Sequence, residues 1–234
     1  MFLNYNTAKM AVAKRTVELF YDVLSPYSWV AFEVLCRYRP KWNVDLQFRP
    51  FFLSGIMAAT GNRPPAMVPA KGTYMVKDIQ RLRQFYGIPM TPPSDFAVTV
   101  FQKGSLSAMR LLTAASKYHP DKVEHLSREF WMRIWSRDED IVEAQSLHEV
   151  CKKVGLNGDE TQSLMSKIGD QETKDKLKET TQKALDLGAF GAPIIVAHVN
   201  GEPHMYFGSD RFLLLSHLLG VEWEGPLKSQ NSKL

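Results

Sequence analysis

The stretch Ser25-Pro26-Tyr27-Ser28 carries two hydroxyl groups where a predicted strand passes directly into a predicted helix. The first N–H groups of a helix have no partner inside it, and the Ser25 hydroxyl can donate a hydrogen bond. Pro26 suits the first helical turn, since the N–H group that it lacks would be unpaired there. Such a corner could hold an anion such as a thiolate. The alternative is that Ser25 is an N-cap and Ser28 an ordinary helix residue.

Other stretches place polar residues where a ligand could lie. Ser209 and Asp210 stand at a predicted helix start, where N–H groups suit a carboxylate and the acid suits an ammonium group, although both could be caps alone. Asn62 and Lys71 fall in a predicted loop rich in proline and glycine, and they could equally be solvated loop residues. Pro193 stands just before the apolar run of a predicted strand. It could help to form a ligand site, or it could be an ordinary strand-edge proline.

Composition excludes several classes of protein. The 234 residues are 44% hydrophobic, which suffices for one sizeable core or a core with a large inserted subdomain. The net charge of +4 is mild, and basic residues alternate with acids instead of forming a nucleic-acid-binding stripe. No apolar run approaches the ~20 residues that span a bilayer. Cys36 and Cys151 form no C-x-x-C, and no Cys/His cluster has zinc spacing, so we expect neither a structural disulfide nor a metal site.

Hydrophobic periodicity predicts the elements that must position these residues. A strand over 16–22, a helix over 26–38 and a strand over 43–51 form a βαβ unit with parallel strands. After a loop over 60–72, helix signals continue almost throughout 74–184, and they are followed by two strands and a helix. The predicted helices of the middle cover residues 74–87, 105–118, 122–140, 141–155 and 170–188, and the last three elements cover 192–199, 204–208 and 209–220.

The order βαβ, helical block, ββα is that of the thioredoxin fold with a large helical insertion. We therefore predict an α/β protein with a thioredoxin-like mixed sheet, and Asn200-Gly201 as the turn of its terminal hairpin. The predicted parts are an N-terminal extension at 1–14, a thioredoxin-like domain at 15–56 and 185–226, an all-α insertion at 57–184, and a C-terminal tail at 227–234.

The thioredoxin fold gives the opening motif a chemical meaning. A C-P-x-C motif lies at this corner in that fold, and the helix N-terminus lowers the pKa of its first cysteine. Ser25-Pro26-Tyr27-Ser28 keeps the spacing but replaces both sulfurs by oxygen, so an external thiol is the natural occupant. Lowering a thiol pKa from ~8.5 by ~2 units takes about 2.7 kcal/mol, which a charge-assisted hydrogen bond and a helix terminus can supply. We also expect Pro193 to be the cis-proline that faces this turn.

The sequence resembles the kappa class of glutathione transferases in six motifs, and the resemblance runs from Arg15 to about Pro226. It implies a DsbA-like fold, a homodimer, glutathione as the thiol, and residence in peroxisomes or mitochondria. The motifs are RTVELFYDVLSPYSW, KGSLSAMR, WMRIWSRDEDI, LKETTQKAL, GAFGAPI and FGSDR.

The resemblance also implies a role for each candidate residue. Ser25 holds the thiolate, Pro26 and Tyr27 line the site, and Asn62 and Lys71 approach glutathione from the loop.

Three positions near the other end of the chain complete this implied site. Ala192, beside Pro193, pairs its backbone with the cysteinyl part of glutathione, and Ser209 and Asp210 hold the γ-glutamyl end. Ala192 is smaller than the residue typical of the family at this position, but the backbone contact does not depend on its side chain.

We therefore expect a detoxifying glutathione transferase that ionises glutathione at Ser25 and conjugates it to hydrophobic electrophiles, with glutathione as cosubstrate and no cofactor. One alternative is a glutathione-dependent isomerase of the chromene-carboxylate type, which regenerates glutathione. The other is a glutathione-binding or chaperone-like module without turnover. A thiol–disulfide oxidoreductase is disfavoured because the active turn has no sulfur. No nucleic acid is expected as a partner, and no membrane span.

The two ends carry targeting hypotheses. Ser232-Lys233-Leu234 matches a C-terminal address read by the peroxisomal import receptor, and its alternative is a solvated polar tail. The first fifteen residues contain no acid and no long apolar run, so they are not a secretory signal. We favour a tail over a mitochondrial presequence for them.

Overall fold

The protein is described by a computed structural model that covers residues 14–227. The tripeptide Ser232-Lys233-Leu234 and nearly all of the predicted N-terminal extension lie outside the described residues. Within the range 14–227, no helix is long and apolar enough to cross a membrane.

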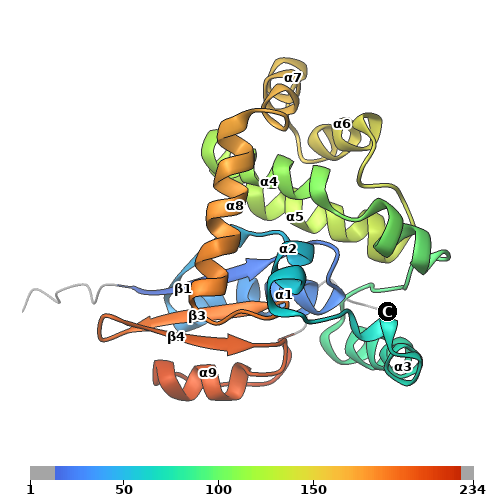
Figure 1. The fold of residues 1–234 in the computed structure, drawn as a ribbon. Helices are drawn as coiled ribbons and strands as arrows, with labels where there is room; N and C mark the ends of the chain where they lie inside the picture. The colour runs from blue at the N-terminus through green and yellow to red at the C-terminus, as the bar shows by residue number, and fades with distance from the viewer. Residues whose placement is uncertain (1–13, 228–234) are drawn as a thin grey trace, which may run out of the picture.

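A mixed sheet of four strands lies at the centre of the fold (Figure 1), in the order β2-β1-β3-β4. The first two strands pair in parallel, and the other two pairs are antiparallel. The predicted βαβ unit and terminal hairpin are therefore confirmed. The strands are β1 (Arg15–Tyr21), β2 (Val44–Pro50), β3 (Ile194–Val199) and β4 (Glu202–Phe207).

Both faces of the sheet are covered, so β1 is buried from Val17 onward although its side chains alternate between the faces. One face packs against α1 (Pro26–Trp42) and α9 (Phe212–Leu219). The other packs against α2 (Leu53–Thr60) and the end of α8 (Gln171–Asp186).

Helices α4 (Leu106–Tyr118), α5 (Val123–Met132), α6 (Ala144–Lys153) and α7 (Gly158–Lys167) lie to one side of the sheet, and α8 returns from them to the strands (Figure 1). The helix α3 (Pro69–Tyr86) lies apart from this group and contacts α1. Short 3-10 turns cover Pro65–Met67 and Pro120–Lys122, and π-helical turns cover Val98–Lys103 and Arg133–Arg137.

Three helices differ from the predicted elements. The short helix α2 was not predicted, because Gly55 interrupts its apolar pattern. Helix α7 was missed although Asn157 and Glu160 form a capping box at its start. Helix α3 begins at Pro69, inside the predicted loop, because proline is favourable in the first turn of a helix. Lys71 therefore lies in the first turn of a helix and not in a loop, which corrects the sequence-based prediction.

The insertion and the sheet share the larger of two hydrophobic clusters, and the smaller one lies on the other face of the sheet. Trp131 of α5 is fully buried and lies nearly parallel to Trp29 of α1, with 6.4 Å between ring centroids. It also contacts Tyr21, whose hydroxyl lies 2.5 Å from the Ser127 hydroxyl of α5. The insertion thus reaches the end of β1, where the candidate residues lie.

Candidate active site

The strand pairing gathers three segments that are far apart in the sequence. Phe20 of β1 pairs with Ile194 of β3, which pairs in turn with Phe207 of β4. The start of α1, the segment before β3 and the turn after β4 therefore meet at one end of the sheet. Gly208 N–H donates to Pro193 O at 3.0 Å and joins the second segment to the third.

Ser25 is the N-cap of α1. Its Oγ accepts a hydrogen bond from Ser28 N at 3.1 Å, and its own N–H donates to Asp22 O at 3.0 Å. The capping role that was the alternative for Ser25 is therefore present. The capping bond uses an oxygen lone pair, so the hydroxyl proton can still be donated to a ligand. Among the described residues, no acceptor of that proton is found.

Two buried indoles hold the backbone of this active turn. Trp131 Nε1 donates to Ser25 O, and Trp135 Nε1 donates to Val23 O, each at 3.2 Å. Both tryptophans are fully buried and anchor the core as well as the turn. Their contact with the turn was not predicted, because more than a hundred residues separate donor and acceptor.

Asp22 lies directly beneath the turn and is fully buried. Its Oδ1 accepts from Leu24 N at 2.9 Å, and its Oδ2 accepts from Leu53 N at 3.0 Å and from Ser105 Oγ at 2.9 Å. Burial raises the pKa of Asp22 to about 6, although these hydrogen bonds oppose the increase. Asp22 was not predicted as a site residue. The signal for it in the sequence was an acidic residue at the end of a buried strand, which is unfavourable without hydrogen-bond partners.

Helix α3 flanks the turn on one side. Tyr27 is half-buried, and its hydroxyl donates to Asp78 Oδ2 of α3 at 2.9 Å. Burial and then the Asp78 carboxylate raise the pKa of the Tyr27 phenol well above its ordinary value. Lys71 is exposed and precedes Asp78 by seven residues, about two helical turns, so both lie on the same face of α3. Asp78 was not predicted from the sequence.

Asn62 joins the segment after α2 to the segment before β3. It follows Gly61, the left-handed cap of α2, and its Nδ2 donates to Phe190 O at 2.6 Å. The Ala192–Pro193 peptide bond is cis, as predicted from the sequence. The structure thus brings Asn62 to the segment that leads into Ala192 and Pro193.

The glycine between Phe190 and Ala192 packs closely against Phe207. A Cβ at Gly191 would lie 3.0 Å from the Phe207 ring, so a larger residue would require that ring to shift by a few tenths of an ångström.

Ser209 and Asp210 follow β4 at the same end of the sheet. The structure begins α9 at Phe212 with Arg211 in the N-cap position and no side-chain cap, so the prediction that Ser209 or Asp210 caps this helix is wrong. Ser209 is buried, whereas the exposed Asp210 forms an ion pair with Arg211 at 3.3 Å. Capping of α9 is therefore excluded as the role of Ser209 and Asp210.

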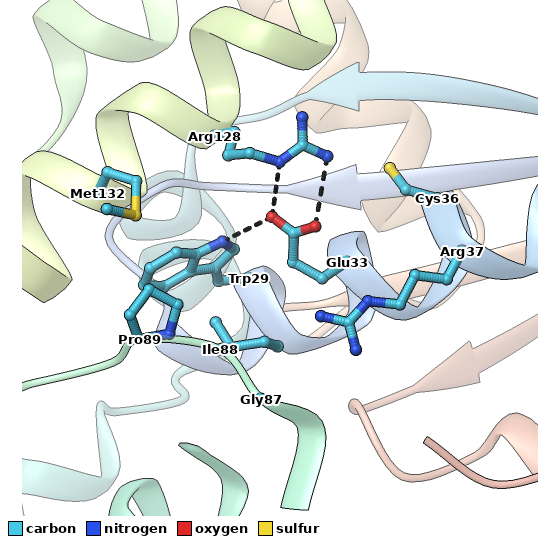
Figure 2. Close-up of a pocket in the computed structure, with 9 residues that line it drawn as sticks. All are labelled: Trp29, Glu33, Cys36, Arg37, Gly87, Ile88, Pro89, Arg128 and Met132. Carbon is cyan, nitrogen blue, oxygen red and sulfur yellow. Dashed lines mark hydrogen bonds and ion pairs between the residues drawn. The ribbon is translucent and has the colours of Figure 1, made fainter. Parts of the chain in front are cut away.

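A pocket of about 420 Å³ lies elsewhere along α1 and contains none of the candidate residues (Figure 2). Glu33 lies on one wall and accepts hydrogen bonds from Trp29 and Arg128. Burial, with nearby Glu124 and Glu33, raises the pKa of the Cys36 thiol well above its ordinary value, so this thiol is protonated at neutral pH. Within residues 14–227, no group of three His, Cys, Asp or Glu side chains could hold a metal ion.

Comparison with known proteins defines the class and then the family. The family model described as "DSBA-like thioredoxin domain" matches residues 16–220. Glutathione S-transferase kappa 1 of Homo sapiens is 54% identical over 218 residues, which cover 93% of this chain and 96% of that protein. Its Caenorhabditis elegans counterpart is 39% identical over 222 residues, covering 93% and 97%. The chain therefore has a DsbA-like thioredoxin domain and belongs to the glutathione S-transferase kappa family.

A solved structure shares the fold at low identity. The structure of a 2-hydroxychromene-2-carboxylate isomerase matches with a TM-score of 0.72 at 19% identity, and the match covers 88% of this chain and 94% of the other.

Proposed function

We propose that this chain is a glutathione transferase that ionises glutathione at Ser25 and adds the thiolate to an electrophilic carbon of a hydrophobic cosubstrate. The observation that carries the proposal is the Ser25 hydroxyl, which caps α1 with its oxygen while its proton can still be donated. A thiolate above the turn would accept that proton in a hydrogen bond and lie at the positive end of the helix. Kappa-class relatives at 54% and 53% identity support the reaction class.

The reaction needs no covalent intermediate with the protein. The thiol proton passes to solvent as glutathione binds, and the thiolate sulfur forms a bond to the electrophilic carbon. With an aryl halide, the halide leaves with the electron pair of the broken carbon–halogen bond. The protein contributes a lower thiol pKa and the alignment of the reacting atoms.

The remaining residues would hold the ends of glutathione. We assign the cysteinyl backbone to Ala192 beside the cis Pro193, and the γ-glutamyl end to Ser209 and Asp210. The gathering of these segments at one end of the sheet supports this assignment.

The active turn and the two segments that flank it would surround the cysteinyl thiol of glutathione. Pro26 and Tyr27 line the site, Asn62 approaches from the segment after α2, and Lys71 approaches from the first turn of α3. Alanine substitution of Asn62 or Lys71 should weaken glutathione binding, and unchanged affinity by calorimetry would remove that residue from the site.

Two substitutions of Ser25 test the thiolate role separately from the capping role. Ser25→Ala removes both, whereas Ser25→Gly removes the hydroxyl but retains most of the capping stability. A lost hydrogen bond to a charged partner is worth ~1.5–3 kcal/mol, so both variants should lose about tenfold to a hundredfold in kcat/KM at neutral pH. The bound thiol should show a higher pKa in its thiolate absorbance, and the loss should shrink at high pH.

The contrary outcome is equally specific. If Ser25 serves as a cap alone, the alanine variant loses about 1 kcal/mol of stability, the glycine variant loses much less, and neither titration curve moves.

The product of the assay distinguishes the reaction classes. A transferase consumes one glutathione for each aryl halide conjugated and releases one halide. An isomerase would leave the glutathione concentration unchanged at completion, and a binding module would bind glutathione without turnover.

We also propose that the protein is a homodimer that resides in peroxisomes. The resemblance to the kappa class supports the dimer, which sedimentation equilibrium should detect as twice the chain mass. Ser232-Lys233-Leu234 supports peroxisomal import, with mitochondria as a second compartment. Deleting the tripeptide should release an N-terminally tagged protein from peroxisomes, and unchanged localisation would contradict the assignment.

A further inference from the structure

Asp22 joins three segments that lie far apart in the sequence. Its carboxylate binds Leu24 of the active turn, Leu53 at the start of α2, and Ser105, the residue before α4. It is fully buried, and these three partners are neutral groups. A buried carboxylate is unfavourable unless its hydrogen bonds are well satisfied, so the arrangement constrains all three segments at once.

Two of these segments lead directly to proposed glutathione contacts. Leu24 precedes Ser25, whose N–H also donates to the Asp22 carbonyl oxygen at 3.0 Å. Leu53 begins the eight-residue helix α2, which is about 12 Å long and ends one residue before the Gly61-Asn62 pair. Asn62 in turn holds Phe190 O, two residues before Ala192. A displacement at Leu53 would therefore reach Asn62 through one short helix.

We infer that Asp22 is a positioning residue for the glutathione site, which fixes the Ser25 turn relative to the segment that carries Asn62. The inference rests on the proposed function of the Ser25 site. Asp22 touches neither substrate in this scheme and acts through the backbone at Leu24 and Leu53.

The carboxylate is required because both of its oxygens accept hydrogen bonds. The amide of an asparagine has the same shape but one acceptor oxygen. In Asp22→Asn, either Leu24 N or the pair formed by Leu53 N and Ser105 Oγ must therefore face an NH₂ group. The turn and α2 can then no longer be held by the same side chain.

The experiment compares Asp22→Asn, Ser105→Ala and Glu18→Gln with the wild-type protein. Glu18 is the matched control because it is a second buried carboxylate, four residues earlier on β1, but its partners lie away from the turn. Each variant is first shown to be folded by circular dichroism. Glutathione affinity is measured by calorimetry, the thiol pKa by thiolate absorbance, and KM and kcat with an aryl halide.

For Asp22→Asn we expect weaker glutathione binding, a higher KM for glutathione, a higher pKa of the bound thiol, and a kcat/KM lower by about tenfold to a hundredfold. Ser105→Ala should shift the same quantities in the same direction by a smaller factor. Glu18→Gln should lower thermal stability and leave glutathione affinity and the thiol pKa unchanged.

A folded Asp22→Asn protein with wild-type glutathione affinity and thiol pKa would overturn the inference. If Asp22→Asn does not fold, Ser105→Ala decides, and unchanged affinity and thiol pKa in that variant would overturn it. Equal shifts in Glu18→Gln would also overturn it, because they would reflect stability alone. If wild type binds glutathione without turnover, the proposed reaction fails, while the affinity and pKa measurements still test Asp22.

Discussion

Ser25 and Ser28 have the same side chain but different surroundings. Ser28 is fully buried, and among the described residues its Oγ has no hydrogen-bond partner. It contributes to the turn through its backbone N–H, which donates to Ser25 Oγ. The second hydroxyl of the motif is therefore not needed for the cap.

This difference makes Ser28→Ala an informative substitution. Alanine keeps the N–H group and removes a buried hydroxyl that has no partner, so stability should stay the same or rise by up to ~1 kcal/mol. kcat/KM and the pKa of bound glutathione should stay within about twofold of wild type. Denaturant unfolding and the aryl halide assay measure both, and a loss as large as that of Ser25→Ala would show that the Ser28 hydroxyl takes part in the site.

At the residue scale, the sequence predicted what local motifs encode. Ser25 and Pro193 were selected because each stands at a recognisable junction of strand and helix or strand and loop. Asp78 and the indole of Trp131 were missed because their contacts with the turn span 51 and 106 residues. Periodicity shows that such residues face the interior, but it does not show which backbone group they meet.

At the element scale, Glu18 ties the end of the insertion to the sheet. Its carboxylate accepts hydrogen bonds from Lys183 of α8 at 2.8 Å and from Arg49 of β2 at 2.6 Å. A ring nitrogen of His198 on β3 lies 2.9 Å from the same carboxylate. Burial alone would raise the pKa of Glu18, but the hydrogen bonds from Lys183, His198 and Arg49 outweigh it and lower the pKa to about 2.

Glu18→Gln should therefore destabilise the protein in a pH-dependent way. The folded-state pKa lies below the ordinary value of 4.5, so the stabilisation is present above about pH 4.5 and is lost as the pH falls toward 2. Near pH 7 the variant should lose about 1–3 kcal/mol of unfolding free energy, because Arg49, Lys183 and His198 are partly exposed and can be hydrated instead. Urea unfolding of both proteins from pH 7 to the acid transition measures this, and a difference that does not narrow with falling pH would contradict the argument.

Strands and long amphipathic helices were predicted closely because their periodicity extends over many residues. The helix 170–188 was observed as α8 (Gln171–Asp186), and the strand 192–199 as β3. Short helices carry little periodic signal, which contributed to missing the eight-residue α2. Lys71 was assigned to a loop because α3 begins at Pro69, within a stretch rich in proline and glycine.

At the scale of the whole molecule, the insertion is part of the core beneath the active turn. One cluster of buried side chains extends from β1 and α1 into α4, α5 and α6. Trp131 links the two parts through Tyr21, Trp29 and Phe32, and its indole N–H holds the carbonyl oxygen of Ser25. Loss of the insertion would therefore expose apolar surface of the sheet and release the turn.

The described part of the chain should consequently unfold in a single cooperative transition. Urea curves followed by tryptophan fluorescence and by far-ultraviolet circular dichroism should coincide, since the larger hydrophobic cluster runs without interruption from β1 and α1 into α4, α5 and α6. Trp131→Phe keeps an aromatic ring but removes the donor to Ser25 O and leaves a cavity. It should therefore lower the free energy of unfolding by about 1–3 kcal/mol and shift both curves to lower urea concentration. Trp135→Phe, which removes the donor to Val23 O in the same way, is the matched comparison. Two separated transitions in the wild-type protein, or a shift of one probe without the other in Trp131→Phe, would mean that the insertion and the sheet are independent units.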